Sequence, residues 1–309
     1  MNRIMQREHL HGSLLAFTGV MALSFDGLLV RLANTQGMDI VFWRGLLMAL
    51  ALTLLLRILD GRWAWTHLRL GGRDAGWVAA GFAATTILFV LAILHTTVAN
   101  VVVILAASPL FAAVFSGLLL REWVPLRTWI AMLIAIGGIV GVLAGSLEAG
   151  GWLGDALALL AALVVGINLT LLRRSPRMDR LAVIAAGGML AALIAWPLAT
   201  PLAIGLDSLA VLAIMGLLQL PLALTLIALS TRFLPAGEVA LFLVLEAVFG
   251  TLWVWLFLAE APGTLTLLAG GLVLLTLAVH ATWGMHQKSS LEYSNFRLYI
   301  KCLSCILSE

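Results

Sequence analysis

Residues 236–260, AGEVALFLVLEAVFGTLWVWLFLAE, form an apolar run with Glu238 and Glu260 near its ends and one further acid, Glu246, near its centre. A transmembrane helix needs about 20 mainly apolar residues, and this run is long enough. It does not alternate between apolar and polar residues, as a membrane β-strand would. The run therefore predicts a membrane-spanning helix with one ionisable residue near the middle of the bilayer.

Similar runs follow one another along the whole chain. The sequence is 62% hydrophobic and 11% charged, whereas a soluble domain is about 25% charged. The connections are too short for a soluble domain, which excludes a nucleotide-hydrolysing pump built on one. We predict an all-α membrane protein with ten spans, at residues 12–32, 39–58, 75–94, 97–120, 126–144, 152–172, 181–199, 207–229, 235–258 and 263–284.

Basic residues predict the orientation of these spans. If the N-terminus is cytoplasmic, every Lys and Arg except Arg31 and Arg44 lies on the cytoplasmic side, as the positive-inside rule requires. We therefore expect both termini in the cytoplasm. The charges are spread over several short segments, which argues against a nucleic-acid partner. Arginine-rich, lysine-poor usage is typical of a GC-rich bacterium and predicts the cytoplasmic (inner) membrane.

The last residues differ from the rest of the chain. Both cysteines, Cys302 and Cys305, and both tyrosines lie there. We interpret residues 286–309 as a cytoplasmic tail, either disordered or appended to the membrane fold. A closed zinc site needs four ligands, and no second cysteine pair exists. We predict neither a metal nor a cofactor.

The chain contains an internal duplication. At an offset of 138 or 142 residues, polar positions of the first half fall on polar positions of the second. Five spans per unit is an odd number, so the two units must be inverted relative to each other, with a binding site between them. We predict an N-terminal segment 1–11 and two units, 12–145 and 146–285. The informative matches are Asp26 with Asn168, Arg31 with Arg173, Asn100 with Glu238 and Glu122 with Glu260.

These features resemble the EamA-type members of the drug/metabolite transporter superfamily. Segments 99–122 and 236–260 resemble the fourth-helix signature of that family, which ends in a glutamate, and residues 42–45, Phe-Trp-Arg-Gly, resemble its second-helix start. The resemblance covers residues 10–285. It implies a basket-like bundle around a central cavity, and export or uptake of amino acids, other metabolites or drugs.

Glu246 is the first candidate for a residue on the transport pathway. A charge at mid-membrane costs about 2.5–3.5 kcal/mol, so its side chain should face protein or water. There it could exchange protons or bind a substrate ammonium group. The alternative is a protonated glutamate that hydrogen-bonds a neighbouring helix. Its counterpart in the first unit is Ser108.

A second group of candidates lies nearer the outer side. Asp26 falls in the outer half of the first span and its counterpart Asn168 in the inner half of the sixth. Inverted units would place both at a similar distance from the bilayer centre, on facing elements. Arg31 or Arg44 could instead neutralise Asp26 in a static ion pair. Arg44, beside Trp43, could attract a substrate carboxylate or reach for the lipid headgroups.

Prolines mark candidate hinges. Pro109, and Pro221 close to Gln219, lie inside predicted spans, where proline frees a backbone carbonyl. Such kinks serve as gating hinges or are fixed for packing. Polar residues near span ends are expected to be hydrated or to cap helices; these are Glu238, Asn100, His95 and His280.

The combined prediction is a secondary transporter, not an enzyme. It would move a small metabolite, an amino acid or a related compound, by alternating access, as an exporter coupled to a proton or a counter-substrate. Alternatives are a drug or cation efflux carrier of the same fold and, with less support, a membrane-embedded enzyme or a channel. Expected partners are the substrate and the lipid bilayer, with the chain a monomer or a weak homo-oligomer.

Overall fold

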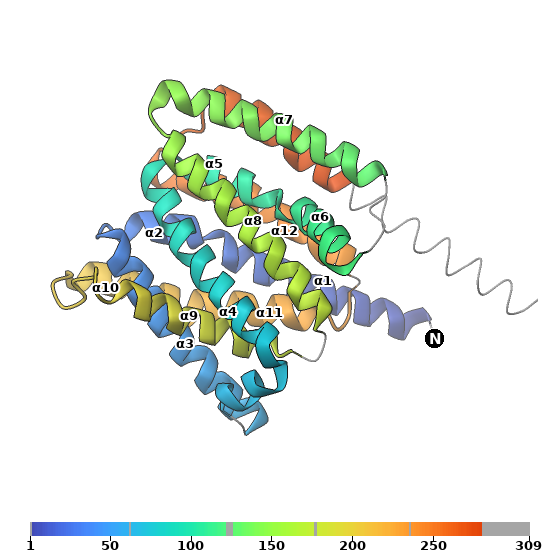
Figure 1. Ribbon diagram of the computed structural model, residues 1–309, viewed down its shortest axis with the longest axis vertical. Helices are drawn as coiled ribbons and strands as arrows, with labels where there is room; N and C mark the ends of the chain where they lie inside the picture. The colour runs from blue at the N-terminus through green and yellow to red at the C-terminus, as the bar shows by residue number, and fades with distance from the viewer. Residues whose placement is uncertain (1, 62, 122–125, 176–177, 235, 280–309) are drawn as a thin grey trace, which may run out of the picture.

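Helices make up nearly all of the protein. The computed structural model describes residues 2–61, 63–121, 126–175, 178–234 and 236–279, and these form helices and connecting segments without a β-strand (Figure 1). The predicted tail 286–309 lies outside the described residues. The all-α fold class is therefore confirmed.

The helices follow the predicted spans, several of them in two or three pieces. Their bounds are α1 Asn2–Ser24, α2 Asp26–Leu32, α3 Gly37–Asp60, α4 Ala64–His95, α5 Val98–Ala106, α6 Ser108–Leu120, α7 Leu126–Ala149, α8 Trp152–Arg174, α9 Arg180–Ala195, α10 Leu206–Ala213, the π-helix η1 Ile214–Gln219, α11 Leu220–Ser230 and α12 Ala236–Leu258. A last apolar helix covers Thr264–Val279.

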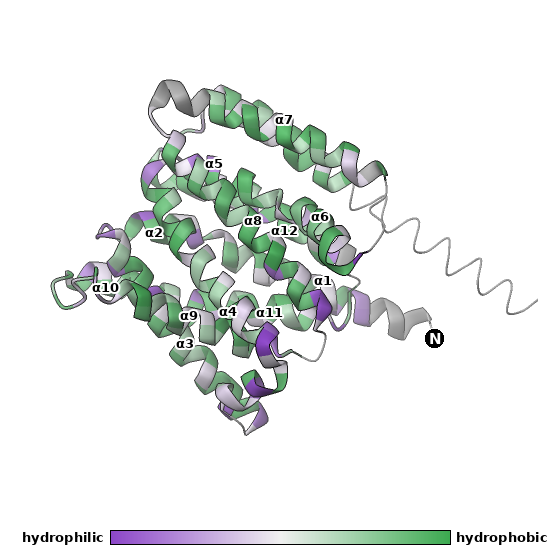
Figure 2. Ribbon diagram, in the orientation of Figure 1, coloured by the Kyte–Doolittle hydropathy of each residue, from purple (hydrophilic) through white to green (hydrophobic). Residues whose placement is uncertain are grey.

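Six helical segments are long and apolar enough to cross a membrane, and four more are shorter apolar helices. Apolar residues run along most of these helices, and polar residues collect mainly toward their ends (Figure 2). Large apolar side chains such as Leu118, Leu133 and Leu256 are exposed, which suits contact with lipid tails. The protein is a multi-pass membrane protein. The number of ten crossings stays a prediction, because the shorter helices fall below a full bilayer span within the described residues.

Two pairs of helical segments run parallel. Three contacts join α1–α2 to α12 and the residues after it at a constant separation of 229 positions: His9 with Glu238, Ser24 with Trp253, and Arg31 with Glu260. Likewise α5–α6 follows α8, because Asn100 bonds Asp155 near one end and the Ala112 carbonyl accepts from Thr170 further along. In each pair, a segment of one half lies beside a segment of the other half.

Helices α3 and α9 cross through glycines. A Cβ atom on Gly45 would collide with the carbonyl oxygen of Gly188, and a Cβ on Gly188 would lie 2.8 Å from the carbonyl oxygen of Gly45. The two backbones can approach this closely only because neither residue has a side chain. The crossing joins the two halves near the middle of both helices.

Helix α7 and the helix Thr264–Val279 lie side by side at one edge of the bundle (Figure 1). Gly138 and Gly141 of α7 face Ala269, whose backbone oxygen would lie 3.1 Å from a Cβ on Gly138. Gly137, by contrast, has open space where a Cβ would stand. The close contact therefore uses Gly138 and Gly141.

Several spans differ from their expected outlines. The predicted first span is broken at Phe25, between α1 and α2. The eighth contains the π-helical turn η1 directly before Pro221, which lacks the N–H that a regular helix needs. Helix α9 ends at Ala195 instead of residue 199, because Pro197 follows and disfavours continuation of the helix. Helix α4 begins at Ala64, before the expected residue 75, and kinks at Gly72.

The glycine crossing yields a stability test. Gly45→Ala should lower the melting temperature of the detergent-solubilised protein, since overpacking against a backbone oxygen typically costs about 1–3 kcal/mol. Gly137→Ala is the matched control, because its new methyl group meets no atom within 4 Å and alanine favours a helix. Equal melting temperatures for the two variants would contradict the close crossing.

Candidate functional site

A buried ion pair lies at the break between α1 and α2. Nη2 of Arg44 on α3 donates to Oδ2 of Asp26, the first residue of α2, at 2.8 Å. Each of the two side chains is 8% exposed. The Arg44 guanidinium also lies over the ring of Phe89 on α4, 5.1 Å from its centre. Of the two arginines expected near Asp26, Arg44 is the partner, and Arg31 pairs with Glu260 instead.

Gln219 stabilises the same break. A helix that stops at Ser24 leaves carbonyl groups without an intrahelical donor. The Gln219 side chain reaches across from η1 and donates Nε2 to the carbonyl of Ala22 at 2.9 Å and to that of Leu23 at 3.4 Å. The break in α1–α2 and the irregular turn before Pro221 therefore face each other. The structure thus gives Gln219 a direct contact with the break that carries Asp26.

Several polar atoms around this break are buried and make no hydrogen bond within the described part of the chain. They are Oδ1 of Asp26, Nε and Nη1 of Arg44, and Oε1 of Gln219. Buried polar groups are normally satisfied, and each exception calls for an explanation. Here acceptors and donors lie together, as a binding site for a polar molecule or for water would require. We call this group, with Glu246, the break site.

Glu246 adds a second carboxylate. It lies near the middle of α12, is partly buried, and interacts electrostatically with both Asp26 and Arg44. Further along α12, Trp253 stacks on Phe25 with ring centres 4.8 Å apart and donates Nε1 to Ser24 at 2.9 Å. Helix α12 therefore brings one acid and one aromatic face to the broken segment of α1–α2.

The other predicted site residues have partners outside this group or mark another helix break. Ser108 and Pro109 mark a second helix break, between α5 and α6. Asn168 packs against Gly81 of α4, where a Cβ would lie 2.7 Å from its Nδ2 atom. Trp43 donates to the carbonyl of Pro201, beyond α9, at 3.2 Å. Among the described residues, Asn168 and Asp26 share no hydrogen bond.

A polar cluster that the sequence did not indicate lies nearer one end of the bundle. Asp155 of α8 is fully buried and accepts from Thr96 Oγ1 at 2.7 Å and from Asn100 Nδ2 at 3.1 Å, while Thr266 donates to Asn100 Oδ1 at 2.8 Å. Asn100 was expected to be a capping or hydrated residue, and is only 3% exposed. Each member lies near the end of its own segment, so only the packing of three segments reveals the cluster.

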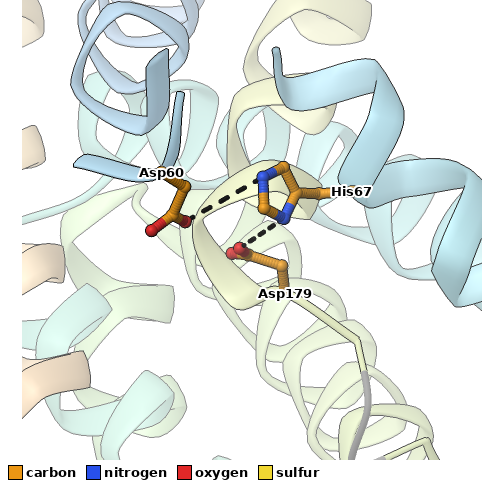
Figure 3. A group of neighbouring side chains, drawn as sticks. All are labelled: Asp60, His67 and Asp179. Atoms are coloured by element: carbon orange, nitrogen blue, oxygen red, sulfur yellow. Dashed lines mark ion pairs between the residues drawn. The ribbon is translucent and has the colours of Figure 1, made fainter. Parts of the chain in front are cut away.

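A histidine links three helices at the opposite end. Figure 3 shows the ring of His67, in the first turns of α4, between the carboxylates of Asp60 and Asp179. Nδ1 lies 3.2 Å from Asp179 and Nε2 lies 3.9 Å from Asp60. One ligand atom from each residue lies within 4.8 Å of the others, a spacing that a metal could draw together. The ring, however, presents a different nitrogen to each acid, which is the geometry of a bridge between carboxylates.

Comparison with known proteins gives a family match for the first part of the chain. Residues 10–144 match the model of the EamA-like transporter family. This match places the chain in the drug/metabolite transporter superfamily. One solved structure, titled "Crystal structure of protein", is similar with a TM-score of 0.62 and 19% identity, covering 87% of this chain and 96% of its own. At that identity the likeness concerns the fold alone. No curated protein matches the sequence.

The superfamily gives the break site its context. EamA-like proteins are membrane transporters, and a membrane transporter binds a small molecule within its helices. In this protein the buried pair of Asp26 and Arg44, with Glu246 near it, groups two acids and one base between the helices. The break site is therefore our candidate for the functional site.

A double-mutant cycle tests the ion pair. Asp26→Asn should destabilise the protein by about 3–5 kcal/mol, because it leaves Arg44 as a buried charge without its partner. Asp26→Asn combined with Arg44→Gln should be less destabilised than the sum of the two single variants. Thermal unfolding in detergent measures all four proteins.

The control cycle uses Arg31→Gln and Glu260→Gln. This pair is 26% and 24% exposed, so its coupling should stay below about 1 kcal/mol. Additive effects of the Asp26 and Arg44 substitutions would show that the two charges do not depend on each other.

Proposed function

We propose that this chain is a secondary transporter that moves a small metabolite, an amino acid or a related compound, by alternating access. The observation that carries the proposal is the break site, where charged and unsatisfied polar atoms lie buried between apolar helices. Charges inside a membrane protein are costly and mark substrate or ion pathways. Discontinuous helices are where such transporters bind substrates.

The packing of the halves supports inverted units. In a chain of two equivalent units, α1–α2 of the first unit corresponds to α8 of the second, and α5–α6 corresponds to α12. The parallel pair of α1–α2 with α12 is therefore equivalent to the parallel pair of α8 with α5–α6, and both pairs are present. The reciprocal contact of Gly45 and Gly188, 143 positions apart, suits a two-fold axis that passes between α3 and α9. The family model covers residues 10–144, close to the first predicted unit, 12–145.

The chemistry of the break site suits a zwitterion. Arg44 offers Nε and Nη1 to a carboxylate, while Asp26 Oδ1 and the Glu246 carboxylate can accept from an ammonium group. Glu246 is also the group that we assign to proton coupling, since among the described residues it makes no direct ion pair with an arginine, whereas Asp26 bonds Arg44 directly. The breaks at Phe25 and Ala107, and the turn before Pro221, are then hinges for the rocking of the two units.

Orientation and direction complete the proposal. By the positive-inside rule, the end with Asp60, His67 and Asp179 faces the cytoplasm and the end with Arg31 and Glu260 faces outward. We place the protein in the cytoplasmic (inner) membrane with both termini inside, as a monomer or a weak homo-oligomer. Export is the direction that we propose, driven by a proton or a counter-substrate.

The first functional test concerns Glu246. In proteoliposomes, Glu246→Gln should abolish the dependence of amino-acid transport on a proton gradient and slow net transport at least tenfold, because the amide cannot exchange a proton. Glu238→Gln is the control, since it removes a carboxylate from the first turn of the same helix, where Glu238 contacts His9 and not the break site. Wild-type rate and pH dependence in Glu246→Gln would refute the coupling role.

A drug or cation efflux carrier is the second candidate. The rings of Phe25 and Trp253 stack on each other, and the ring centre of Phe249 lies 6.1 Å from that of Trp253. These aromatic faces belong to the segments that carry the carboxylates of Asp26 and Glu246. Aromatic faces and acids together attract organic cations, by about 0.5–2 kcal/mol for each cation–π contact. This arrangement is the observation that supports a cationic aromatic substrate as the second candidate.

The aromatic face is tested by Trp253→Leu. If the protein exports cations, cells that overproduce this variant should lose most of their added resistance to a cationic dye such as ethidium. Amino-acid export should fall much less. Trp255→Leu is the matched control, because Trp255 is 55% exposed on the same helix. Equal resistance with Trp253→Leu and with the wild type would exclude cation binding at this face.

A further inference from the structure

A polar hollow lies near the end of the bundle that carries Arg31 and Glu260. Its volume is about 540 Å³, within the range of small-molecule sites. Its lining includes the ion pair Arg31–Glu260, the amide of Asn100 and the hydroxyl-bearing residues Thr97, Thr264 and Thr266. We call it the Glu260 pocket. Segments of both halves of the chain form its wall, and none of its lining residues belongs to the break site.

The ion pair in the Glu260 pocket is loose and accessible. Arg31 lies 3.3 and 3.4 Å from the two carboxylate oxygens of Glu260, longer than the 2.7–2.9 Å of a strong charge-assisted bond. About a quarter of each side chain is exposed, while Nε of Arg31, the atom 3.3 Å from Glu260 Oε2, is buried and makes no hydrogen bond of good geometry among the described residues. The exposed parts of both charged groups are thus accessible to a further partner.

The wall behind the pair is rigidly built. Glu260 Oε1 accepts from the backbone N–H of Val98 at 3.0 Å, and Nη2 of Arg31 donates to the carbonyl of Thr96 at 2.8 Å. The buried cluster of Asp155, Asn100 and Thr266 fixes the amide of Asn100 against the pocket. Groups fixed in this way lose little further entropy when a ligand binds.

We propose that the Glu260 pocket is a second binding site, for a small zwitterion whose carboxylate contacts Arg31 and whose ammonium group contacts Glu260. The two charged side chains that line the pocket are of opposite sign, so a ligand with both charges leaves neither one unpaired. A pure anion or cation would pair with one side chain and leave the other without a partner. The exposed Thr264 hydroxyl, which also lines the pocket, supplies a further polar contact. This inference rests on the proposed transport function, in which the pocket is a substrate-binding site on the outward-facing side of the protein.

The test measures ligand binding to the purified full chain in detergent by isothermal titration calorimetry. The probes are L-leucine, 4-methylpentanoate, which lacks its ammonium group, and 3-methylbutylamine, which lacks its carboxylate. L-leucine should bind at least tenfold more tightly than either analogue, because each charge-assisted contact contributes about 1.5–3 kcal/mol, equal to tenfold or more.

Three variants locate the site. Arg31→Gln and Glu260→Gln should each weaken leucine binding to the pocket about tenfold or more. Thr264→Trp leaves the ion pair in place and should abolish leucine binding to the pocket by filling it, and its exposed position tolerates a large side chain. Asp74→Asn is the matched control, because Asp74 pairs with Arg174 outside the pocket. It should bind leucine like the wild type.

The outcomes separate this inference from the proposed function. Arg44→Gln removes the cation of the break site, and leucine binding to the Glu260 pocket should persist in it. Leucine binding that survives all three pocket variants but is lost in Arg44→Gln overturns the second site and leaves the transporter intact. If the pocket variants weaken leucine binding but the wild-type protein transports no amino acid in proteoliposomes, the transport proposal alone is overturned. Equal affinity for either analogue, or no leucine binding to the wild type, overturns the zwitterion site.

Discussion

The pairing of Asp26 with Arg44 is the interaction on which the interior of this protein depends. In the lipid core no water is present to satisfy a charge or a free backbone group, so each must find a partner inside the bundle. The break at Phe25 exposes carbonyls, and Gln219 donates to two of them. The same break directs Asp26 toward Arg44, and Trp253 donates to Ser24 beside it. Four separate segments are thereby fixed around one irregular turn.

Charges toward the ends of the helices behave differently, because water reaches them. The Arg31–Glu260 and His67–Asp179 contacts are longer and more exposed than the buried pair. Such contacts add little stability and break at low cost. Under the proposed alternating access, such contacts suit the ends that open and close, whereas the Asp26–Arg44 pair suits a centre that persists throughout.

Glycine contacts make such motion feasible. Gly45 and Gly188 bring two backbones together without interlocking side chains, and Gly19 of α1 approaches the backbone of α11 near Ala223 in the same way. Interfaces of small residues depend on close backbone packing and contain few bulky groups that would have to be displaced. The halves of the chain therefore meet over surfaces on which small rotations disturb few side chains.

The sequence by itself determined that the chain is an all-helical membrane protein, because apolar runs are local properties of the chain, and its segments resemble those of the drug/metabolite transporter superfamily. It also pointed to Asp26, Arg44 and Gln219, since polar groups in apolar spans are conspicuous. Only the tertiary structure decided that Asp26 pairs with Arg44 and not with Arg31, that Gln219 supports the α1–α2 break, and that Asp155, Asn100 and Thr266 form one cluster. Those contacts join residues far apart in sequence, and their partners depend on how the helices cross, which no single apolar run encodes.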